Sequence, residues 1–323
     1  MSIKKFALRF LFYSSLLLLV NFGFGYLFKW NSAKNSELGI FYPSKRWNEF
    51  YSIPKESLDI SFVGSSLCYR GINPEIVDSI TDKKSFNLGS SIQSISTSHY
   101  IIEELLEYQK PKVIFLDILP RTLNLESQLE SVRYNYEFMN SGKAKSGLYA
   151  EGLNFGEKVQ FLFPAYYKRD QLNSILKYSL KPMDLSKISD RYYKNGFVTS
   201  SKRMSAKTLE LKSKNLEKFN WKETERTDSH LDHLQQIIDL CKSYQIELII
   251  TISPLPQKFY KNIEQEEFEK LIAKISQENN LKFYNFNKLN LPLIDTLHFK
   301  DQHLNGSGAK ILSTEIATII NGL

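Results

Sequence analysis

The stretch Ile60-Ser61-Phe62-Val63-Gly64-Ser65-Ser66-Leu67 decides the fold. Its first half is apolar and has the length of a buried strand, whereas Gly64-Ser65-Ser66 is typical of a turn. The segment Asn73-Pro74-Glu75 follows, with an N-cap residue, a proline for the first turn and an acid, and so predicts the start of a helix. Open parallel sheets bind their ligands at the carboxyl ends of the strands, so we expect a serine hydroxyl of Gly64-Ser65-Ser66 at that edge.

The strand pattern recurs four more times along the chain and alternates with helical patterns. A strand, helix, strand alternation of this kind predicts a parallel sheet with helices on both faces. The predicted strands are Asp59–Gly64, Lys84–Leu88, Val113–Ile118, Ile246–Ile252 and Lys282–Phe286. The predicted helices include Ser98–Gln109, Ala309–Ile320, and helices around residues 231–241 and 268–275.

Residues 120–227, approximately, interrupt this alternation with a segment rich in Lys, Tyr, Phe, Ser and Asn. Its only amphipathic pieces are weak, at Gln171–Tyr178 and Ala206–Phe219. A long insertion after a central strand often forms a cap or a wall that holds substrate. Its mixture of basic and aromatic residues, as in Tyr166-Tyr167-Lys168-Arg169, suits a carbohydrate or an anionic glycan, and a solvated helical flap is the alternative interpretation.

The N-terminal region contains an uncharged run of 19 residues, Phe10–Phe28. A helix needs about 20 apolar residues to cross a bilayer, so this run is long enough to span. Because no Ala-x-Ala cleavage site follows, residues 1–30 indicate an uncleaved signal anchor rather than a cleaved signal peptide. The cations before the run predict a cytoplasmic N-terminus and an extracytoplasmic main domain. They are Lys4, Lys5 and Arg9.

Composition excludes several classes of function. The chain of 323 residues carries a formal charge of +7, of which +4 lies in residues 1–30, so the remainder does not form a nucleic-acid-binding surface. Two cysteines, Cys68 and Cys241, cannot form a disulfide scaffold, and we expect two buried, reduced thiols. No cofactor or metal site is predicted. Residues 31–58 are interpreted as a connector that packs on the α/β domain of residues 59–323.

A second signal lies near the end of the chain, at Asp301-Gln302-His303-Leu304-Asn305-Gly306-Ser307-Gly308. A serine hydroxyl is a weak nucleophile until a base accepts its proton, and a histidine can serve as that base near neutral pH. An aspartate that accepts the other ring N–H fixes the tautomer of the histidine. We therefore predict a catalytic set formed by a serine of the early Ser65-Ser66 pair with His303 and Asp301.

Other histidines compete for this role. Asp295 and His298 have the commoner Asp-x-x-His spacing, but His303 leads directly into the Leu-Asn-x-x-Gly start of the last helix and is preferred. The three remaining histidines are interpreted as surface or helix residues rather than ligands. They are His99, His230 and His233.

In these features the sequence resembles the SGNH, or GDSL-like, hydrolase superfamily, over roughly residues 59–119 and 228–323. The resemblance implies a five-stranded, flavodoxin-like α/β/α sandwich in which Ser66 is the nucleophile and Ser65 replaces the usual Asp. It also implies that the backbone N–H groups of Ser66 and Gly89 bind the oxyanion. The family's third block supplies an Asn that is missing from Leu116-Asp117-Ile118-Leu119-Pro120-Arg121. Arg121 or Asn124 is the candidate to replace it.

Within the superfamily, the Asp-x-His ending looks most like the membrane-associated branch that includes alginate O-acetyltransferase subunits and the D-alanine transfer protein. This resemblance implies a membrane-anchored serine esterase or O-acyltransferase, which takes an acyl donor and a glycan or small ester. It also implies a membrane-bound O-acyltransferase as partner. The alternative is a catalytically inactive glycan-binding module that serves such a partner, and a lipid-modifying role is a third hypothesis.

Overall fold

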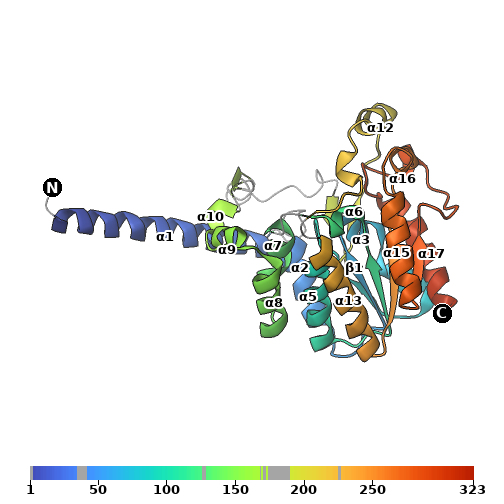
Figure 1. Cartoon of the computed structure of the whole chain (residues 1–323), viewed down its shortest axis with the longest axis horizontal. Helices are drawn as coiled ribbons and strands as arrows, with labels where there is room; N and C mark the ends of the chain where they lie inside the picture. Colours follow the sequence, from blue (N-terminus) through green and yellow to red (C-terminus); the bar gives the residue numbers. More distant parts are fainter. Residues whose placement is uncertain are drawn as a thin grey trace.

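The chain is seen in a computed structural model that describes residues 3–34, 42–125, 129–167, 169, 172–173, 190–224 and 227–323. The predicted amphipathic piece Gln171–Tyr178 lies outside these residues, apart from 172–173. The main part of the chain is a sheet flanked by helices, and a single long helix projects from it (Figure 1).

The five predicted strands are confirmed, and all of them pair in parallel. The sheet order is β2-β1-β3-β6-β7, which is the order 2-1-3-4-5 of flavodoxin-like folds. Gly64, at the end of β1, pairs with Asp117, at the end of β3, so the two strands finish at the same edge. The strands are β1 (Ile60–Gly64), β2 (Ser85–Asn87), β3 (Val113–Asp117), β6 (Glu247–Ile252) and β7 (Lys282–Asn285).

Both faces of the sheet are buried, which explains why the central strands are almost continuously apolar. In β3, Ile114 and Leu116 face one hydrophobic cluster with α5, α13 and α15, while Val113 and Phe115 face the other with α3, α4 and α17. The flanking helices are α3 (Ser66–Gly71), α4 (Pro74–Thr81), α5 (Ile95–Tyr108), α13 (Thr227–Ser243), α14 (Gln257–Tyr260), α15 (Glu266–Glu278), α16 (Asp295–His298) and α17 (Gly306–Asn321).

The insertion after β3 contributes short helices and a small antiparallel ribbon rather than one compact unit. Its first helix, α6, begins directly after β3 and reaches the same sheet edge as β1. Its elements are α6 (Pro120–Leu123), α7 (Leu129–Tyr136), α8 (Gly142–Gly152), α9 (Phe155–Phe161), α10 (Pro164–Tyr167), β4 (Asp190–Tyr192), β5 (Val198–Ser200), α12 (Ala206–Lys212) and the 3₁₀ turn η3 (Glu217–Phe219).

The N-terminal region forms two helices. The first, α1 (Ile3–Lys34), contains a segment, Ile3–Phe28, that is long and apolar enough to cross a membrane. The second, α2 (Tyr42–Ser52), lies in the region interpreted as a connector that packs on the domain, and it is a helix although the sequence shows no clear period there. It buries Trp47 and Phe50 against the sheet cluster that contains α5. The hydrophobic face of α2 therefore makes it part of the core.

A buried cation, Arg46, accompanies these apolar residues on α2. Its guanidinium donates hydrogen bonds to the carbonyls of Leu88 (3.2 Å) and Gly89, and to Asn135 Oδ1 at 2.6 Å. The planar guanidinium can reach several acceptors at once, which a lysine ammonium on a flexible stem cannot do in the same geometry. Arg46 thus ties the loop after β2 to α7.

We expect Arg46→Lys to lower the free energy of unfolding by about 2 kcal/mol, since at least one buried acceptor would lose its charged partner. The measurement is urea unfolding of the full chain in detergent micelles. Asn48→Ala is the control, because Asn48 is exposed on the same helix and its replacement leaves the core intact. Equal stability of Arg46→Lys and the control would contradict this account of Arg46.

Candidate active site

Ser66 lies at the carboxyl edge of the sheet because β1 ends abruptly at Gly64. Gly64 has φ +156°, and a Cβ at this position would lie 2.7 Å from Asp117 Cβ, so a larger residue would separate β1 from β3. Ser65 is the N-cap of α3, and its side chain accepts a hydrogen bond from the Leu67 N–H. Ser66 is therefore the first residue of α3, immediately after the end of the strand.

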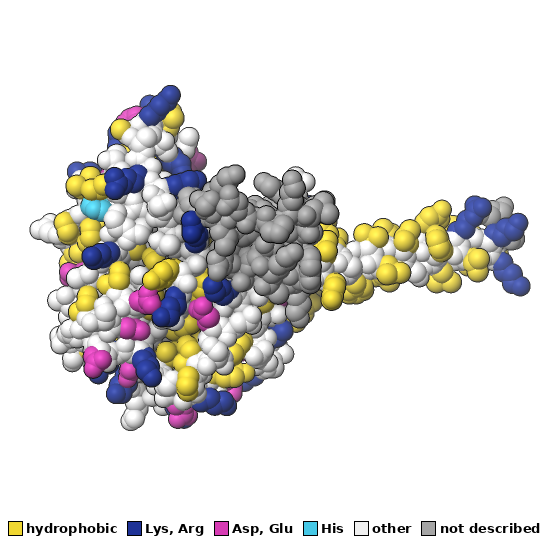
Figure 2. All heavy atoms as spheres, turned by 180° about the vertical axis from the view of Figure 1, so that it is seen from behind, with side chains coloured by type: hydrophobic (Ala, Val, Ile, Leu, Met, Phe, Trp, Pro, Cys, Tyr) yellow, Lys and Arg dark blue, Asp and Glu magenta, His cyan; other side chains and the backbone are white. Residues whose placement is uncertain are grey.

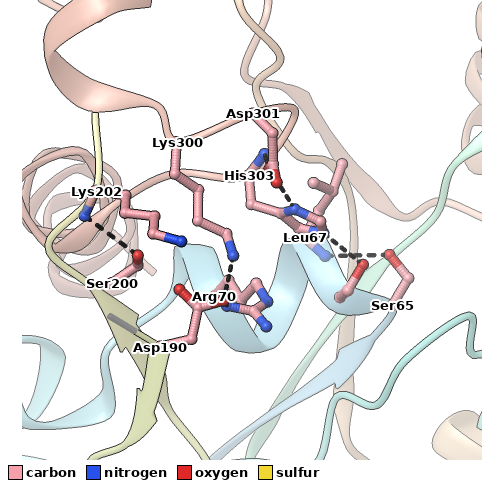
Figure 3. Close-up of polar contacts among 10 residues, drawn as sticks. Ser65, Leu67, Arg70, Asp190, Ser200, Lys202, Lys300, Asp301 and His303 are labelled. Atoms are coloured by element: carbon pink, nitrogen blue, oxygen red, sulfur yellow. Dashed lines mark hydrogen bonds and ion pairs between the residues drawn. The ribbon is translucent and has the colours of Figure 1, made fainter. Parts of the chain in front are cut away.

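Asp301 and His303 lie in a tight loop between α16 and α17. An antiparallel bridge joins Phe299 to Leu304, and the Lys300 N–H donates to the His303 carbonyl at 3.0 Å. Within this loop, Asp301 Oδ1 accepts hydrogen bonds from the His303 backbone N–H at 2.9 Å and from His303 Nδ1 at 2.6 Å. The short Asp-x-His spacing therefore works because the chain turns back on itself between the two residues (Figure 3).

The structure brings the three predicted residues together. His303 Nε2 lies 2.8 Å from Ser66 Oγ, so Asp301, His303 and Ser66 form a continuous series of hydrogen bonds. Since a carboxylate only accepts, we assign the Nδ1 proton to the bond with Asp301, which leaves Nε2 to accept from the serine hydroxyl. This is the tautomer that a general base acting on Ser66 requires.

Burial lowers the pKa of His303, and this effect exceeds the opposing influence of Asp301. Burial alone would raise the pKa of Asp301, but its hydrogen bond to His303 and the charge of His303 hold it well below the ordinary value. At neutral pH the site therefore contains an ionised Asp301 and a neutral imidazole that is ready to accept a proton.

The segment after His303 fixes the loop against the last helix. Asn305 is the N-cap of α17, and its Oδ1 accepts from the N–H groups of Ser307 and Gly308, both at 3.1 Å. Its Nδ2 donates to the Leu297 carbonyl at 2.8 Å. At Gly308 a Cβ would lie 2.3 Å from the His298 carbonyl oxygen, so only glycine lets the helix approach the loop this closely. The Leu-Asn-x-x-Gly pattern thus positions His303.

The competing pair has other partners. The carboxylate of Asp295 accepts from the N–H groups of Gln257 (2.6 Å) and Lys258 (3.0 Å), at the start of α14. His298 Nδ1 accepts from the Ile294 N–H at 2.8 Å. Because Asp295 and His298 bond to backbone N–H groups, whereas His303 bonds to both Asp301 and Ser66, the structure favours Asp301 and His303.

Gly89 requires a correction to the predicted oxyanion site. Its N–H donates to Asn87 Oδ1 at 2.9 Å, and its carbonyl accepts from Arg46. Gly89 is also buried and is not among the residues that line the cavity beside Ser66. The Gly89 N–H is thus used within a local turn, by its hydrogen bond to Asn87, and does not point towards a bound substrate. Ser66, whose N–H is the first of α3 and has no intrahelical partner, remains a candidate donor.

A cavity of about 290 Å³ lies beside Ser66 and His303. Its walls come from the start of α3, the loop after β2, α6 and η3 of the insertion, the loop after β6, the N-cap of α15 and the His303 loop. Arg121, on α6, lines this cavity and makes no hydrogen bond or ion pair within the described part of the chain, whereas Asn124 does not line it. Of the two candidates for the missing Asn, the structure therefore retains Arg121.

An ion cluster that the sequence analysis missed supports the His303 loop (Figure 3). Asp190, on β4 of the insertion, accepts from Arg70 Nη1 at 3.1 Å and from Lys300 Nζ. Burial alone would raise the pKa of Asp190, but the charges of Arg70 and Lys300 lower it. Because Lys300 directly precedes Asp301, this cluster joins β4, α3 and the loop that carries the candidate base.

The remaining histidines have structural contacts. His99 on α5 and His233 on α13 meet through their Nδ1 atoms at 3.1 Å, and His230 Nδ1 lies 2.5 Å from the Leu123 carbonyl. They are helix residues, as predicted, but they are buried rather than on the surface. Cys68 and Cys241 are buried free thiols, which confirms the prediction for them.

No protein-family model matches the sequence, and no curated protein matches it. Solved structures resemble it at low identity. A proposed acylhydrolase from Bacteroides fragilis has a TM-score of 0.41 and 10% identity, covering 86% of this chain and 95% of that chain. A GDSL-like lipase from Bacteroides thetaiotaomicron has a TM-score of 0.39 and 12% identity, covering 86% of this chain and 97% of that chain. An acetyl xylan esterase from the rumen bacterium Butyrivibrio proteoclasticus has a TM-score of 0.33 and 10% identity, covering 84% of this chain and 65% of that chain.

Asp117 lies below the nucleophile loop, at the end of β3. Its Oδ1 accepts from the Ser253 N–H at 2.8 Å, while Oδ2 has no hydrogen-bond partner among the described residues. Burial raises the pKa of Asp117 to about 7, against the opposing hydrogen bond from Ser253. The folded state thus favours the neutral acid. The free energy of unfolding of the wild-type chain therefore falls as the pH rises from the pKa of Asp117 in the unfolded chain towards its folded pKa of about 7.

We expect Asp117→Asn, which keeps an acceptor for Ser253 without a charge, to become more stable relative to wild type as the pH rises. The difference should grow by up to ~1.4 kcal/mol per pH unit and level off above pH ~7. Urea unfolding at several pH values measures it. The exposed Asp239→Asn is the control and should show no such trend. A pH-independent difference for Asp117→Asn would contradict a neutral Asp117.

Proposed function

We propose that the chain is a membrane-anchored serine esterase or O-acyltransferase of the SGNH type, which acts on a cell-envelope or exported glycan through an acyl-enzyme on Ser66. The observation that carries this proposal is the series of hydrogen bonds from Asp301 through His303 to Ser66, at 2.6 and 2.8 Å. A nucleophile, a base and a group that orients the base, each within hydrogen-bond reach of the next, are the requirements for acyl transfer through serine.

The reaction follows from this arrangement. Ser66 Oγ attacks the carbonyl carbon of the ester while its proton passes to His303 Nε2, and Asp301 stabilises the resulting imidazolium. When the tetrahedral intermediate collapses, the imidazolium returns the proton to the departing alkoxide, and the acyl group stays on Ser66. A water or an acceptor hydroxyl, deprotonated by His303, then takes the acyl group and regenerates the serine.

The oxyanion of the tetrahedral intermediate needs donors that are already in place. The Ser66 N–H at the start of α3 supplies one, and Arg121 is the second candidate because its side chain lines the cavity. A donor of this kind contributes about 2.7–4 kcal/mol to the transition state of related reactions. A guanidinium would serve an anionic oxygen through a charge-assisted hydrogen bond.

The cavity favours a short acyl group. Its volume of about 290 Å³ is at the lower end of the range of about 300–1,000 Å³ that is usual for small-molecule sites. Aromatic and cationic side chains at its walls, Phe219 and Arg121, would suit a sugar ring and an anionic group of a glycan. Hydrolysis and transfer share the same acyl-enzyme, so the choice between them depends on the acceptor that a partner, such as a membrane-bound O-acyltransferase, presents.

The proposed location rests on α1. Its cations Lys4, Lys5 and Arg9 lie before the apolar run, which supports a single-pass anchor with a cytoplasmic N-terminus and an extracytoplasmic catalytic domain. An anchored enzyme would stay beside a membrane donor system and a growing glycan.

A second candidate function is a glycan-binding module without catalysis. The observation that favours it is the hydrogen bond from the Gly89 N–H to Asn87, since this bond removes one of the two expected oxyanion donors. Such a module would keep the cavity but would never form a covalent adduct. The adduct therefore discriminates between the two candidates.

We expect the purified full chain in detergent micelles to react with a fluorophosphonate probe and Ser66→Ala to lose this labelling completely, because the probe captures an activated serine. Ser65→Ala is the matched control: it removes the N-cap side chain of α3, at a cost of about 1 kcal/mol in stability, but keeps the nucleophile. Mass spectrometry locates the adduct. Labelling of Ser66→Ala at the wild-type level would end the acyl-enzyme proposal, and polysaccharide binding by an unreactive wild type would favour the glycan-binding module.

The pH dependence of turnover tests the base. Since burial lowers the pKa of His303, kcat/KM for p-nitrophenyl acetate should rise with pH through a midpoint below the ordinary histidine value of 6.5 and stay high at neutral pH. Asp301→Asn removes the anion that favours the imidazolium, so the midpoint should move lower still and the plateau should fall roughly 10²–10⁴-fold. Asp295→Asn should leave the midpoint unchanged. If the pH profile is unaltered in Asp301→Asn but shifted in Asp295→Asn, then Asp295 and His298, rather than Asp301 and His303, form the catalytic pair.

A further inference from the structure

Two short helices of the insertion, α9 and α10, carry large apolar side chains on their outer surface. The exposed residues of this segment, between 41% and 83% exposed, are Phe155, Val159, Leu162, Phe163 and Tyr166. Single exposed apolar residues are common in soluble proteins, but five in a segment of 12 residues form a patch that would be unfavourable in water. We call the segment Phe155–Tyr166 the apolar hairpin.

The apolar hairpin lies against α1 within its apolar run rather than beyond it (Figure 1). A Cβ at Gly25 would lie 3.2 Å from Pro164, so the two backbones approach closely there. Asn21, the other contact, is seven residues before Phe28, the last residue of the run, which corresponds to about 10 Å along a helix. If α1 spans a bilayer with this run, the hairpin contacts it below the hydrocarbon surface.

Asn21 provides polar contacts at this depth. It is a buried polar residue within the uncharged run Phe10–Phe28, and its Nδ2 donates to the Leu162 carbonyl at 3.3 Å while its Oδ1 accepts from the Ala165 N–H at 3.1 Å. These two backbone groups lie at the break between α9 and α10. Hydrocarbon excludes unpaired backbone groups, and irregular backbone is tolerated there only when protein satisfies it. Small residues and side-chain amides at helix contacts, here Gly25 and Asn21, are typical of membrane interiors.

A groove of about 700 Å³ separates the rest of the hairpin from α1. Leu17 and Leu18 form one wall, and Val159 and Phe163 form the other. The side chains of α1 beyond this groove are exposed and largely apolar, and Figure 2 shows hydrophobic side chains spaced along the projecting helix and cations near its free end. If α1 spans the membrane, lipid acyl chains surround its exposed apolar surface. The same acyl chains would then fill the groove that is continuous with this surface.

We propose that the apolar hairpin is inserted into the bilayer leaflet next to the catalytic domain, with its exposed aromatic and aliphatic side chains among lipid acyl chains and with Asn21 holding it to α1. This proposal rests on the membrane anchoring by α1 that is part of the proposed function. It goes beyond a simple tether, because a tethered domain would move freely above the membrane, whereas an inserted hairpin fixes one side of the domain to the surface.

The charged residues of the segment are compatible with insertion. Glu157 is buried, and its carboxylate accepts from the N–H groups of Asn154 and Leu129. Lys158 donates to the Ala150 carbonyl at 2.6 Å, towards the catalytic domain. Arg169, just after the hairpin, donates to the Tyr166 carbonyl, and its guanidinium lies 4.4 Å from the centre of the Tyr166 ring. An aromatic ring with an adjacent cation is typical of the headgroup region.

The test uses the full chain with Phe155→Cys, labelled with the environment-sensitive fluorophore NBD and reconstituted in vesicles of phosphatidylcholine and phosphatidylglycerol. The native cysteines are buried, and unlabelled wild type checks that they do not react. Leu211→Cys on α12 is the matched control, since Leu211 is an exposed apolar residue outside the hairpin. Doxyl-labelled lipids quench a fluorophore in the bilayer, and iodide quenches one in water.

We expect NBD at position 155 to show blue-shifted emission, quenching by doxyl lipids and no quenching by iodide, with the opposite behaviour at position 211. Iodide quenching at 155 as strong as at 211 would overturn the proposal, and so would protection from both quenchers, which would indicate a covering protein or a second copy. Release of the protein from the vesicles by alkaline carbonate would contradict both the membrane anchoring by α1 and the insertion of the hairpin. Fluorophosphonate labelling of Ser66 in the same sample reports on the catalytic proposal independently.

Discussion

The hydrogen bond between Ser66 Oγ and His303 Nε2 joins residues that are 237 positions apart, and the rest of the site depends on it. Hydrogen bonds weaken steeply when distance or angle departs from the optimum, so both ends must be fixed closely. The Ser66 end is fixed where Gly64 packs against Asp117, because no side chain separates β1 from β3. The His303 end is fixed by the bridge from Phe299 to Leu304, which closes the loop.

The sheet and the three residues of the series could be predicted because each leaves a local pattern. The central strands, which are buried on both faces, are apolar runs, and the glycine that ends β1 is needed by the backbone itself. Residues that follow such a strand lie at the carboxyl edge, so the Ser65-Ser66 pair could be placed without tertiary information, whereas the choice of Ser66 came from the resemblance of the motif. His303 could be chosen over His298 because the Asn305 cap and Gly308 mark the start of a helix.

The supports of the site could not be predicted, since they depend on which buried groups meet. Arg46 lies in a segment without a clear period, and its partners come from residues more than 40 positions away. The orientation of the Gly89 N–H depends on the side chain of Asn87, although an Asn two residues before a glycine is a known turn signal and could have been weighed. Asp190 lies in an irregular insertion, where nothing in the sequence indicates that it would meet Lys300.

These supports also connect the proposed membrane contact to the cavity. Glu157, on α9, accepts from the Leu129 N–H at the start of α7, and α7 carries Asn135. Asn135 accepts from Arg46 and donates to Ser90 Oγ at 3.0 Å, and Ser90 in turn donates to Gln93, which lines the cavity. The same short helix thus contacts both the apolar hairpin and the loop after β2. If the hairpin is inserted in the leaflet, α7 holds the cavity at a fixed height above the bilayer, so that an acyl donor in the membrane and Ser66 meet in a constant geometry.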